Sequence, residues 1–153
     1  MLKVDTSMEI FAGLVAAVDW YDNSLQNILA SRGLRVVNRG QAMMLVHIAK
    51  GTTRPSDIAR EMRTTRQNIH AMAKGLVEDK YLHLIQDPAD GRSRQYAFGV
   101  EAAAQRKKTL EILNYLNHRL ADRIGKDTIK DLSRGLLVDW GALIEEAPPM
   151  AAK

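Results

Sequence analysis

Residues 64–74 carry a dense set of side chains that can bind the edges of nucleic-acid bases. An arginine can donate two hydrogen bonds to the O6 and N7 atoms of guanine, and glutamine or asparagine can pair twice with the N6 and N7 atoms of adenine. Hydroxyl and cationic groups beside them can bind phosphates. The candidate DNA contacts in this segment are Thr64, Thr65, Arg66, Gln67, Asn68, His70 and Lys74.

The spacing of apolar residues predicts that a helix beginning near Thr65 presents this set. Its expected inward face consists of Ile69, Met72, Ala73 and Leu76. The opposite, solvent-facing side then carries Arg66, Gln67, His70 and Lys74. The hydroxyls of Thr64 and Thr65 can cap the start of the helix, and the first turn of such a helix reaches deepest into a major groove.

A shorter helix is predicted just before the first. Pro55 and Ser56 are typical of a helix start, and the buried positions would be Ile58, Ala59 and Met62. The short gap between the two helices indicates a helix-turn-helix pair. Arg54 and Ser56, at the start of the shorter helix, join the candidate DNA contacts.

A β-hairpin is predicted after the pair, because the residues from Tyr81 become β-prone and alternate in polarity. A turn is expected at Asp87, Pro88, Asp90 and Gly91, with the second strand at Ser93 to Phe98. Arg92 and Arg94 would lie beside the tip, where an arginine can enter a narrow minor groove. We expect Asp90 and Gly91 to support this wing, with Asp90 fixing either the arginine or the turn.

Composition narrows the function classes. The chain has no cysteine, which excludes disulfides, thiolate metal sites and a catalytic thiol. The net charge of +4 is small, but residues 50–94 hold nine Lys or Arg against six Asp or Glu, so the basic excess is concentrated there. No run of about 18 apolar residues is present to cross a membrane. We therefore expect a cytoplasmic protein.

Long helices are predicted on both sides of the winged segment. The first would run to Ser31 with one apolar stripe: Phe11, Leu14, Val18, Tyr21, Leu25 and Ile28. A short helix starting at Asn38 would bury Met44, Leu45 and Ile48. A helix from about Glu101 carries Leu110, Leu113, Leu116 and Leu120, and a last helix from Asp127 would bury Ile129, Leu132, Leu136, Trp140 and Leu143. The fold class is therefore mainly α with a small β-hairpin wing (α+β), in one domain over residues 1–153.

Three stretches of the sequence resemble the MarR family of bacterial transcription regulators: Pro55-Ser56-Asp57-Ile58-Ala59, Thr65-Arg66-Gln67-Asn68-Ile69 and Asp87-Pro88-Ala89-Asp90-Gly91-Arg92-Ser93. The order of helices agrees as well, so the resemblance covers nearly the whole chain. Departures are Gly91 in place of a frequent arginine, Lys80 in place of a frequent glycine, and Phe98-Gly99 in place of the usual Leu-Thr.

The resemblance implies a winged helix-turn-helix at residues 34–100, flanked by dimerisation helices at residues 6–32 and 101–147. It also implies a homodimer that binds duplex DNA at a pseudo-palindromic operator on the bacterial nucleoid, most commonly as a repressor. Members of the family often release DNA when a small aromatic molecule binds. Possible lining residues for such a ligand are Trp20, Tyr21, Met43, Met44 and His47.

Other interpretations remain open at this stage. The helix beginning near Thr65, which we call the reader helix, could be an ordinary solvated basic helix. The terminal helices could form an intramolecular bundle within one chain. The five possible ligand-lining residues could simply be part of the hydrophobic core. A winged helix can also serve protein or RNA contacts, and the scattered histidines could form a metal-responsive site: His47, His70, His83 and His118. No phosphate-binding glycine loop, serine elbow or paired-histidine zinc helix is present, so an enzyme is not expected, nor is a cofactor.

Overall fold

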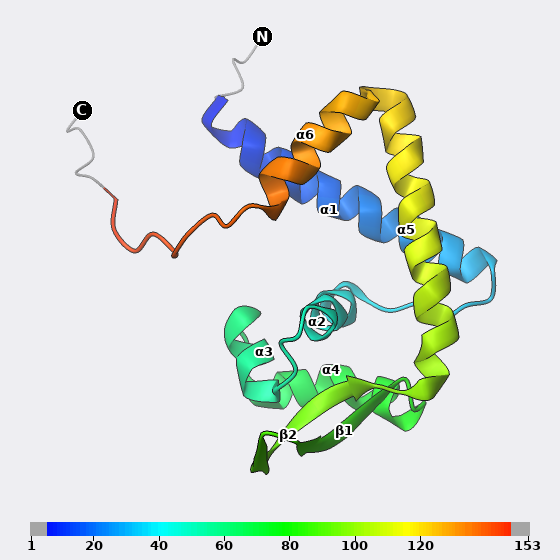
Figure 1. Cartoon of the computed structure of the whole chain (residues 1–153), viewed down its shortest axis with the longest axis vertical. Helices are drawn as coiled ribbons and strands as arrows, with labels where there is room; N and C mark the ends of the chain where they lie inside the picture. The colour runs from blue at the N-terminus through cyan, green and yellow to red at the C-terminus, as the bar shows by residue number, and fades with distance from the viewer. Residues whose placement is uncertain (1–5, 148–153) are drawn as a thin grey trace. The chain divides into compact units, whose positions relative to one another are not determined.

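The computed structural model describes residues 6–147 of the chain, with side chains from Met8 onward. Figure 1 shows the elements, which in chain order are α1 (Thr6–Ser31), α2 (Arg39–Ala49), α3 (Pro55–Glu61), α4 (Arg66–Glu78), β1 (Leu82–Asp87), β2 (Asp90–Phe98), the 3-10 turn η1 (Val100–Ala102), α5 (Ala103–Ile124) and α6 (Lys126–Leu137). The predicted fold class is confirmed. The chain divides into two compact units with the boundary inside α5, after Leu116, and the prediction of one domain stays a prediction.

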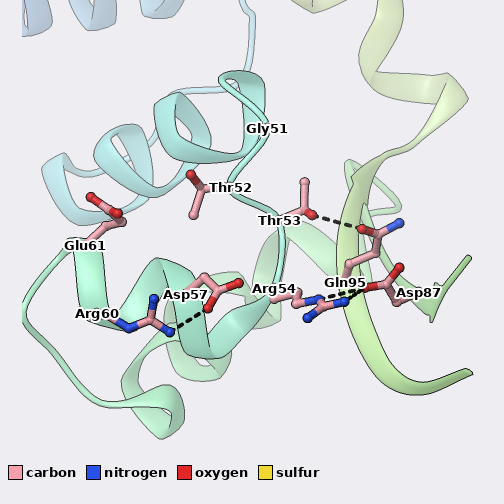
Figure 2. Close-up of a pocket in the computed structure, with 9 residues that line it drawn as sticks. All are labelled: Gly51, Thr52, Thr53, Arg54, Asp57, Arg60, Glu61, Asp87 and Gln95. Atoms are coloured by element: carbon pink, nitrogen blue, oxygen red, sulfur yellow. Dashed lines mark hydrogen bonds and ion pairs between the residues drawn. The ribbon is translucent and has the colours of Figure 1, made fainter. Parts of the chain in front are cut away.

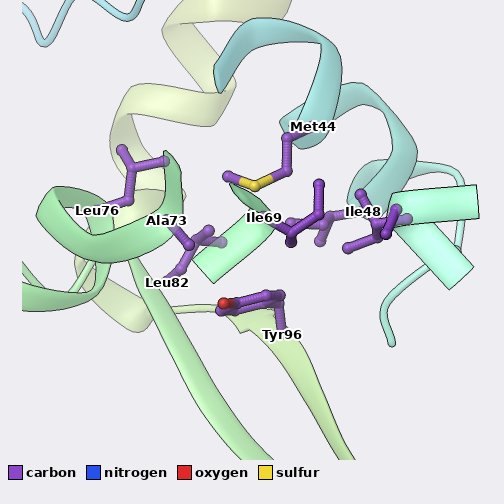
Figure 3. Packing of buried hydrophobic residues seen from close by; sticks show 9 residues of the cluster. Met44, Ile48, Ile69, Ala73, Leu76, Leu82 and Tyr96 are labelled. Atoms are coloured by element: carbon purple, nitrogen blue, oxygen red, sulfur yellow. The ribbon is translucent and has the colours of Figure 1, made fainter. Parts of the chain in front are cut away.

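Helices α2, α3 and α4 and the hairpin close around one apolar core (Figure 3). The predicted inward face of α4 is buried at Ile69, Ala73 and Leu76, and Met72 packs against the same core. Full burial of a side chain as large as Ile69 or Leu76 stabilises the fold by about 1.5–3 kcal/mol. The buried members of this core are Met44, Ile48, Ile58, Ala59, Ile69, Ala73, Leu76, Leu82 and Tyr96.

The helix starts follow the capping chemistry expected of the sequence. Asn38 accepts a hydrogen bond from the backbone of Gln41, and the Gln41 side chain accepts one from the Asn38 backbone, which completes a capping box on α2. Gln41 also donates to the carbonyl of Met72, 3.1 Å away, and so joins α2 to α4. The start of α2 is thereby fixed against the middle of the candidate reader helix.

The wing turns earlier than the sequence indicated. Strands β1 and β2 pair antiparallel from Leu82 opposite Phe98 to Asp87 opposite Asp90, with an irregularity after Gln86. The two-residue turn is therefore Pro88 and Ala89, and Gly91 lies within β2. Proline presets the backbone angle that a turn needs, and the Asp87 carboxylate accepts a hydrogen bond from the Ala89 amide, which explains the shift.

A second, separate core joins α1 to α5. Leu29, Ile112 and Leu116 are buried, and residues packed against them include Trp20 and Tyr21. No side chain belongs to both cores among the residues described. The first half of the predicted α1 stripe is uncovered, with Phe11 70% exposed.

The second unit corrects the prediction for the last helix. Helix α6 ends at Leu137, well before residue 147, and none of its residues is buried. The amide of Gly141 donates to the Asp139 side chain, and Gly141 adopts a φ of 82°, so the backbone turns where the apolar pattern continued. The side chains of Trp140 and Leu143, expected to be buried, are exposed.

The backbone at Lys80 has a φ of 58°, in the left-handed region that glycine adopts without strain. The turn after α4 therefore has the backbone conformation typical of glycine, although the residue at this position is a lysine. We expect Lys80→Gly to raise the free energy of unfolding by about 1 kcal/mol. Chemical denaturation measures this, with Lys108→Gly, in the middle of α5, as a control that should lose about 1 kcal/mol. A loss at Lys80 as well would contradict the argument.

Within residues 6–147, no helix combines the length and the apolar content needed to cross a membrane.

Candidate nucleic-acid interface

The first turn of α4 presents two long polar side chains on a fixed backbone. The Thr65 hydroxyl accepts a hydrogen bond from the Asn68 amide at 3.1 Å, and the Asn68 side chain donates to the Thr64 hydroxyl at 2.8 Å. Arg66 and Gln67 are exposed, and no hydrogen bond within residues 6–147 holds their side chains. Thr64, Thr65 and Asn68 therefore fix the turn, and Arg66 and Gln67 are available for bases.

The solvent face of α4 is less uniform than its sequence indicated. His70 is half-buried, and its Nδ1 atom lies 2.7 Å from the hydroxyl of Tyr96, a core residue of β2. Lys74 is exposed and lies 4.0 Å from Glu78 on the next turn. His70 thus ties α4 to the wing, whereas Lys74 remains on the open surface. Ser56, near the start of α3, is exposed as well.

The Asp90 carboxylate braces the turn at the tip of the wing. One of its oxygens accepts from the Ser93 hydroxyl at 2.8 Å and the other from the Arg92 amide at 3.1 Å. The hydrogen bonds from Ser93 and Arg92 lower the pKa of Asp90. We expected Asp90 to fix either the arginine side chain or the turn. Its contacts are with the Arg92 backbone amide and the Ser93 hydroxyl, which favours the role of fixing the turn. Arg92 and Arg94 are exposed on β2.

Sequence reasoning missed the contact that attaches the wing to α3. Asp87 is only 6% exposed, and its carboxylate lies 2.7 Å from Nε and 2.6 Å from Nη2 of Arg54 (Figure 2). Two further bonds join the same segments: the Thr53 hydroxyl donates to Gln95 at 2.9 Å, and the Tyr96 amide donates to the Thr53 carbonyl at 2.9 Å. Arg54, predicted as a DNA contact, thus directs its guanidinium at the wing.

A polar hollow of about 410 Å³ lies beside this attachment (Figure 2). Its lining mixes acidic, basic and hydroxyl side chains: Gly51, Thr52, Thr53, Arg54, Asp57, Arg60, Glu61, Asp87 and Gln95. Arg60 is paired with Asp57 at 2.7 Å, as Arg54 is with Asp87. Most of its charge is therefore already neutralised within the chain.

The wing attachment should respond to acid. The Ala89 amide and the Arg54 guanidinium hold the pKa of Asp87 below its usual value. A carboxylate whose pKa is lowered in the folded state stabilises the fold at pH values above its unfolded-state pKa of about 4. This stabilisation is lost as the pH falls from there through the folded-state pKa. We expect thermal unfolding of the native chain to shift down between pH 5 and pH 3 by more than that of Asp87→Asn. Equal shifts would contradict this role for Asp87.

Three of the five residues predicted to line a ligand pocket lie in or against two different cores. Met44 is fully buried in the winged core, while Trp20 and Tyr21 pack in the α1–α5 core and meet edge to face at 5.0 Å. Met43 and His47 are half-buried on α2. None of the five lines the hollow of Figure 2. Met44 has the environment of an ordinary core methionine.

No group of three or more His, Asp or Glu side chains within residues 6–147 is arranged to hold a metal ion. His70 faces Tyr96, and His83 lies 3.9 Å from Glu101.

Comparison with known proteins gives one sequence match and many structural ones. Residues 37–93 match the family model described as the MarR family. No curated protein matches the chain in sequence. The solved structures it resembles include the transcriptional repressor CouR bound to a 23-mer DNA duplex, with a TM-score of 0.65, 18% identity, and coverage of 89% of this chain and 95% of that one.

Two further structures extend the comparison. A MarR-family transcriptional regulator from Rhodococcus sp. RHA1 has a TM-score of 0.64 at 17% identity, covering 88% of this chain and 94% of its own. Wild-type MarR from E. coli has a TM-score of 0.61 at 17% identity, covering 82% and 93%. At such identities the likeness is one of fold. Residues 37–93 are therefore similar in sequence to the MarR family, and the chain shares the fold of solved members of that family.

Proposed function

We propose that the protein is a homodimeric transcription regulator that binds duplex DNA at a pseudo-palindromic operator, on the bacterial nucleoid in the cytoplasm. The observation that carries this proposal is the first turn of α4, where two base-binding side chains extend from a capped and rigid backbone. The wing supplies basic side chains from a second element. The DNA-bound structure of CouR, which shares this fold, supports the same use of the fold here.

The contacts divide by chemistry. Arg66 and Gln67 read base edges in the major groove, because both are exposed and can form paired hydrogen bonds. Arg92 enters the minor groove from the wing, where the negative potential is concentrated. Lys74 and Arg94 contact phosphates, which fix the register without reading the sequence.

The dimer is supported by apolar surface that one protomer leaves uncovered. Phe11 and Val18 on α1 are exposed, and so are Leu136 on α6 and Trp140 beyond it. Large exposed apolar side chains on long helices are typical of a surface that another subunit covers. A two-fold dimer would place its reader helices about 34 Å apart, one turn of DNA.

Repression, with release by a small aromatic ligand, is the finer part of the proposal. CouR, whose fold this chain shares, is described as a transcriptional repressor. We propose that this protein likewise prevents transcription while it is bound to its operator. Trp20 and Tyr21 are the residues we would expect to sense an aromatic ligand, since they lie in the core that joins α1 to α5.

Selection of bound fragments from genomic DNA by the purified chain tests DNA binding and identifies the operator together. We expect fragments that share a pseudo-palindrome with half-sites about one helical turn apart. Enrichment of RNA or of a protein partner with no duplex enriched would support the alternative of a winged helix for other contacts, and would overturn the proposal.

Arg92→Ala should weaken binding to every duplex and reduce the slope of log affinity against log salt by about 1, because one cation that displaces counterions from the minor groove is lost. Gln67→Ala should instead change the preference between sequences and leave the slope as it was. Titrations of labelled duplexes at several salt concentrations measure both. An Arg92 variant with an unchanged salt slope would remove the wing from the interface.

A further inference from the structure

The linker between α1 and α2 is held to α5 by a paired hydrogen bond. The backbone amide of Arg35 donates to Oε1 of Gln105 at 3.0 Å, and Nε2 of Gln105 donates back to the Arg35 carbonyl at 2.9 Å. Both bonds are partly buried and join residues 70 positions apart. A single glutamine therefore satisfies the donor and the acceptor of one linker residue, which fixes the linker against the first turns of α5.

The side chain of the same arginine reaches the other way, to the end of α4. Its guanidinium pairs with Asp79 and lies 5.8 Å from the ring centre of Tyr81. Tyr81 in turn meets Phe98 edge to face at 6.1 Å, with 78° between the ring planes. The ion pair between Arg35 and Asp79 is exposed and contributes little stability alone. The contact with the Tyr81 ring additionally restricts the orientation of the guanidinium.

Arg106 completes the arrangement from α5. Its guanidinium lies 3.9 Å from the ring centre of Phe98, the last residue of β2. Two arginines thus flank two aromatic rings in edge-to-face contact, one arginine from the α1–α2 linker and one from α5. We call this set the Arg35 junction: Arg35, Asp79, Tyr81, Phe98, Gln105 and Arg106.

The junction is where the winged segment meets the α1–α2 linker and α5. Among the side chains that the structure describes, none belongs to both apolar cores, so packing within either core does not set the angle between them. Directional contacts have to do this, and a second group helps: Arg39 at the start of α2 pairs with Asp19 at 2.7 Å and Asp22 at 2.6 Å on α1. The Arg39 contacts join α2 to α1, whereas the Arg35 junction joins the winged segment and the α1–α2 linker to α5.

We propose that Arg35, Gln105 and Arg106 are positioning residues that set the angle of the winged helix against α1 and α5, and thereby the half-site spacing that the dimer accepts on DNA. The spacing part rests on the proposed function. The angle part concerns one protomer and stands on the contacts alone.

Distances between spin labels test the angle without DNA. The chain has no cysteine, so the pair Ala71→Cys and Glu111→Cys, both at exposed positions on α4 and α5, can be labelled cleanly. Dilution with unlabelled chain restricts the signal to distances within one protomer. We expect a narrow distribution in the labelled parent and a broader or shifted one in Arg35→Ala/Gln105→Ala.

Arg32→Ala and Lys107→Ala serve as controls, since they remove neighbouring exposed charges and none of the junction contacts. Gln105→Ala alone covers the case in which the double variant fails to fold, because it removes only the paired hydrogen bonds. Distributions that coincide for the parent, Gln105→Ala and the double variant would overturn the proposal.

A set of operators with half-sites moved by one base pair tests the consequence. We expect the parent to discriminate between spacings, and the junction variants to lose about 3- to 10-fold of that discrimination while the control variants keep it. Undiminished discrimination in the variants would overturn the link to spacing. A parent that binds no duplex would refute the proposed function, while the label distances would still decide the role of the junction.

Discussion

Replacement of Gly99 by alanine is expected to lower the free energy of unfolding by about 3 kcal/mol, the upper end of the usual cost of overpacking. A Cβ atom at this position would lie 2.0 Å from the backbone carbonyl oxygen of Lys80. Backbone cannot turn aside as a side chain can, and the Gly99 amide already donates to the Tyr81 carbonyl at 2.9 Å. The end of β2 would have to separate from the turn after α4. Urea denaturation measures the change.

Gly75→Ala is the matched control, because a Cβ there meets no atom within 4 Å and the residue lies inside α4. Alanine in a helix interior should stabilise the chain by about 0.5–1 kcal/mol. Opposite signs for the two glycines are therefore expected. A Gly99 variant as stable as the parent would show that the contact with Lys80 can relax.

Phe11→Asp is expected to give a folded monomer whose affinity for the operator is lower by about 100-fold or more. Phe11 is 70% exposed in the protomer and belongs to neither core, so the loss of its ring should not unfold the chain. A buried carboxylate at the subunit contact would oppose association. Each half then binds alone, without the gain that comes from linking two sites. Sedimentation at micromolar concentration and duplex titration measure the two effects.

Val100→Asp provides the control, since Val100 is also an exposed apolar residue but lies in the turn before α5. It should remain dimeric. If Phe11→Asp also sediments as a dimer, the N-terminal half of α1 is not the subunit contact.

The elements that follow a regular pattern were predictable. The inward face of α4 follows from residues three and four apart, and the hairpin from alternating β-prone residues around a proline turn. The contact between Arg54 and Asp87 could not be foreseen in this way, because it joins positions 33 residues apart and depends on the strand register. An aspartate next to a wing turn and an unmatched arginine before α3 were the only signals.

The differences from the predicted structure after α6 and at His70 on α4 have local causes. Apolar residues continue past Leu137 with helical spacing, but the Asp139–Gly141 turn ends the pattern, and periodicity alone does not register a competing turn. His70 lies at the border of the solvent face of α4, where a hydrogen bond with a nearby hydroxyl orients its ring. The hydroxyl belongs to Tyr96, whose position follows only from the assembled hairpin.

The separation of the two apolar cores has a consequence for how such proteins diverge. The winged core draws all its side chains, buried and partly buried, from residues 37–98, almost the same span as the family match at 37–93. Substitutions in the core that joins α1 to α5 can therefore accumulate without altering the packing of the winged core. Under the proposed function, exchanges at Arg66 or Gln67, which belong to neither core, would redirect the protein to a new operator without remodelling its packing, so target choice and assembly could evolve at independent rates.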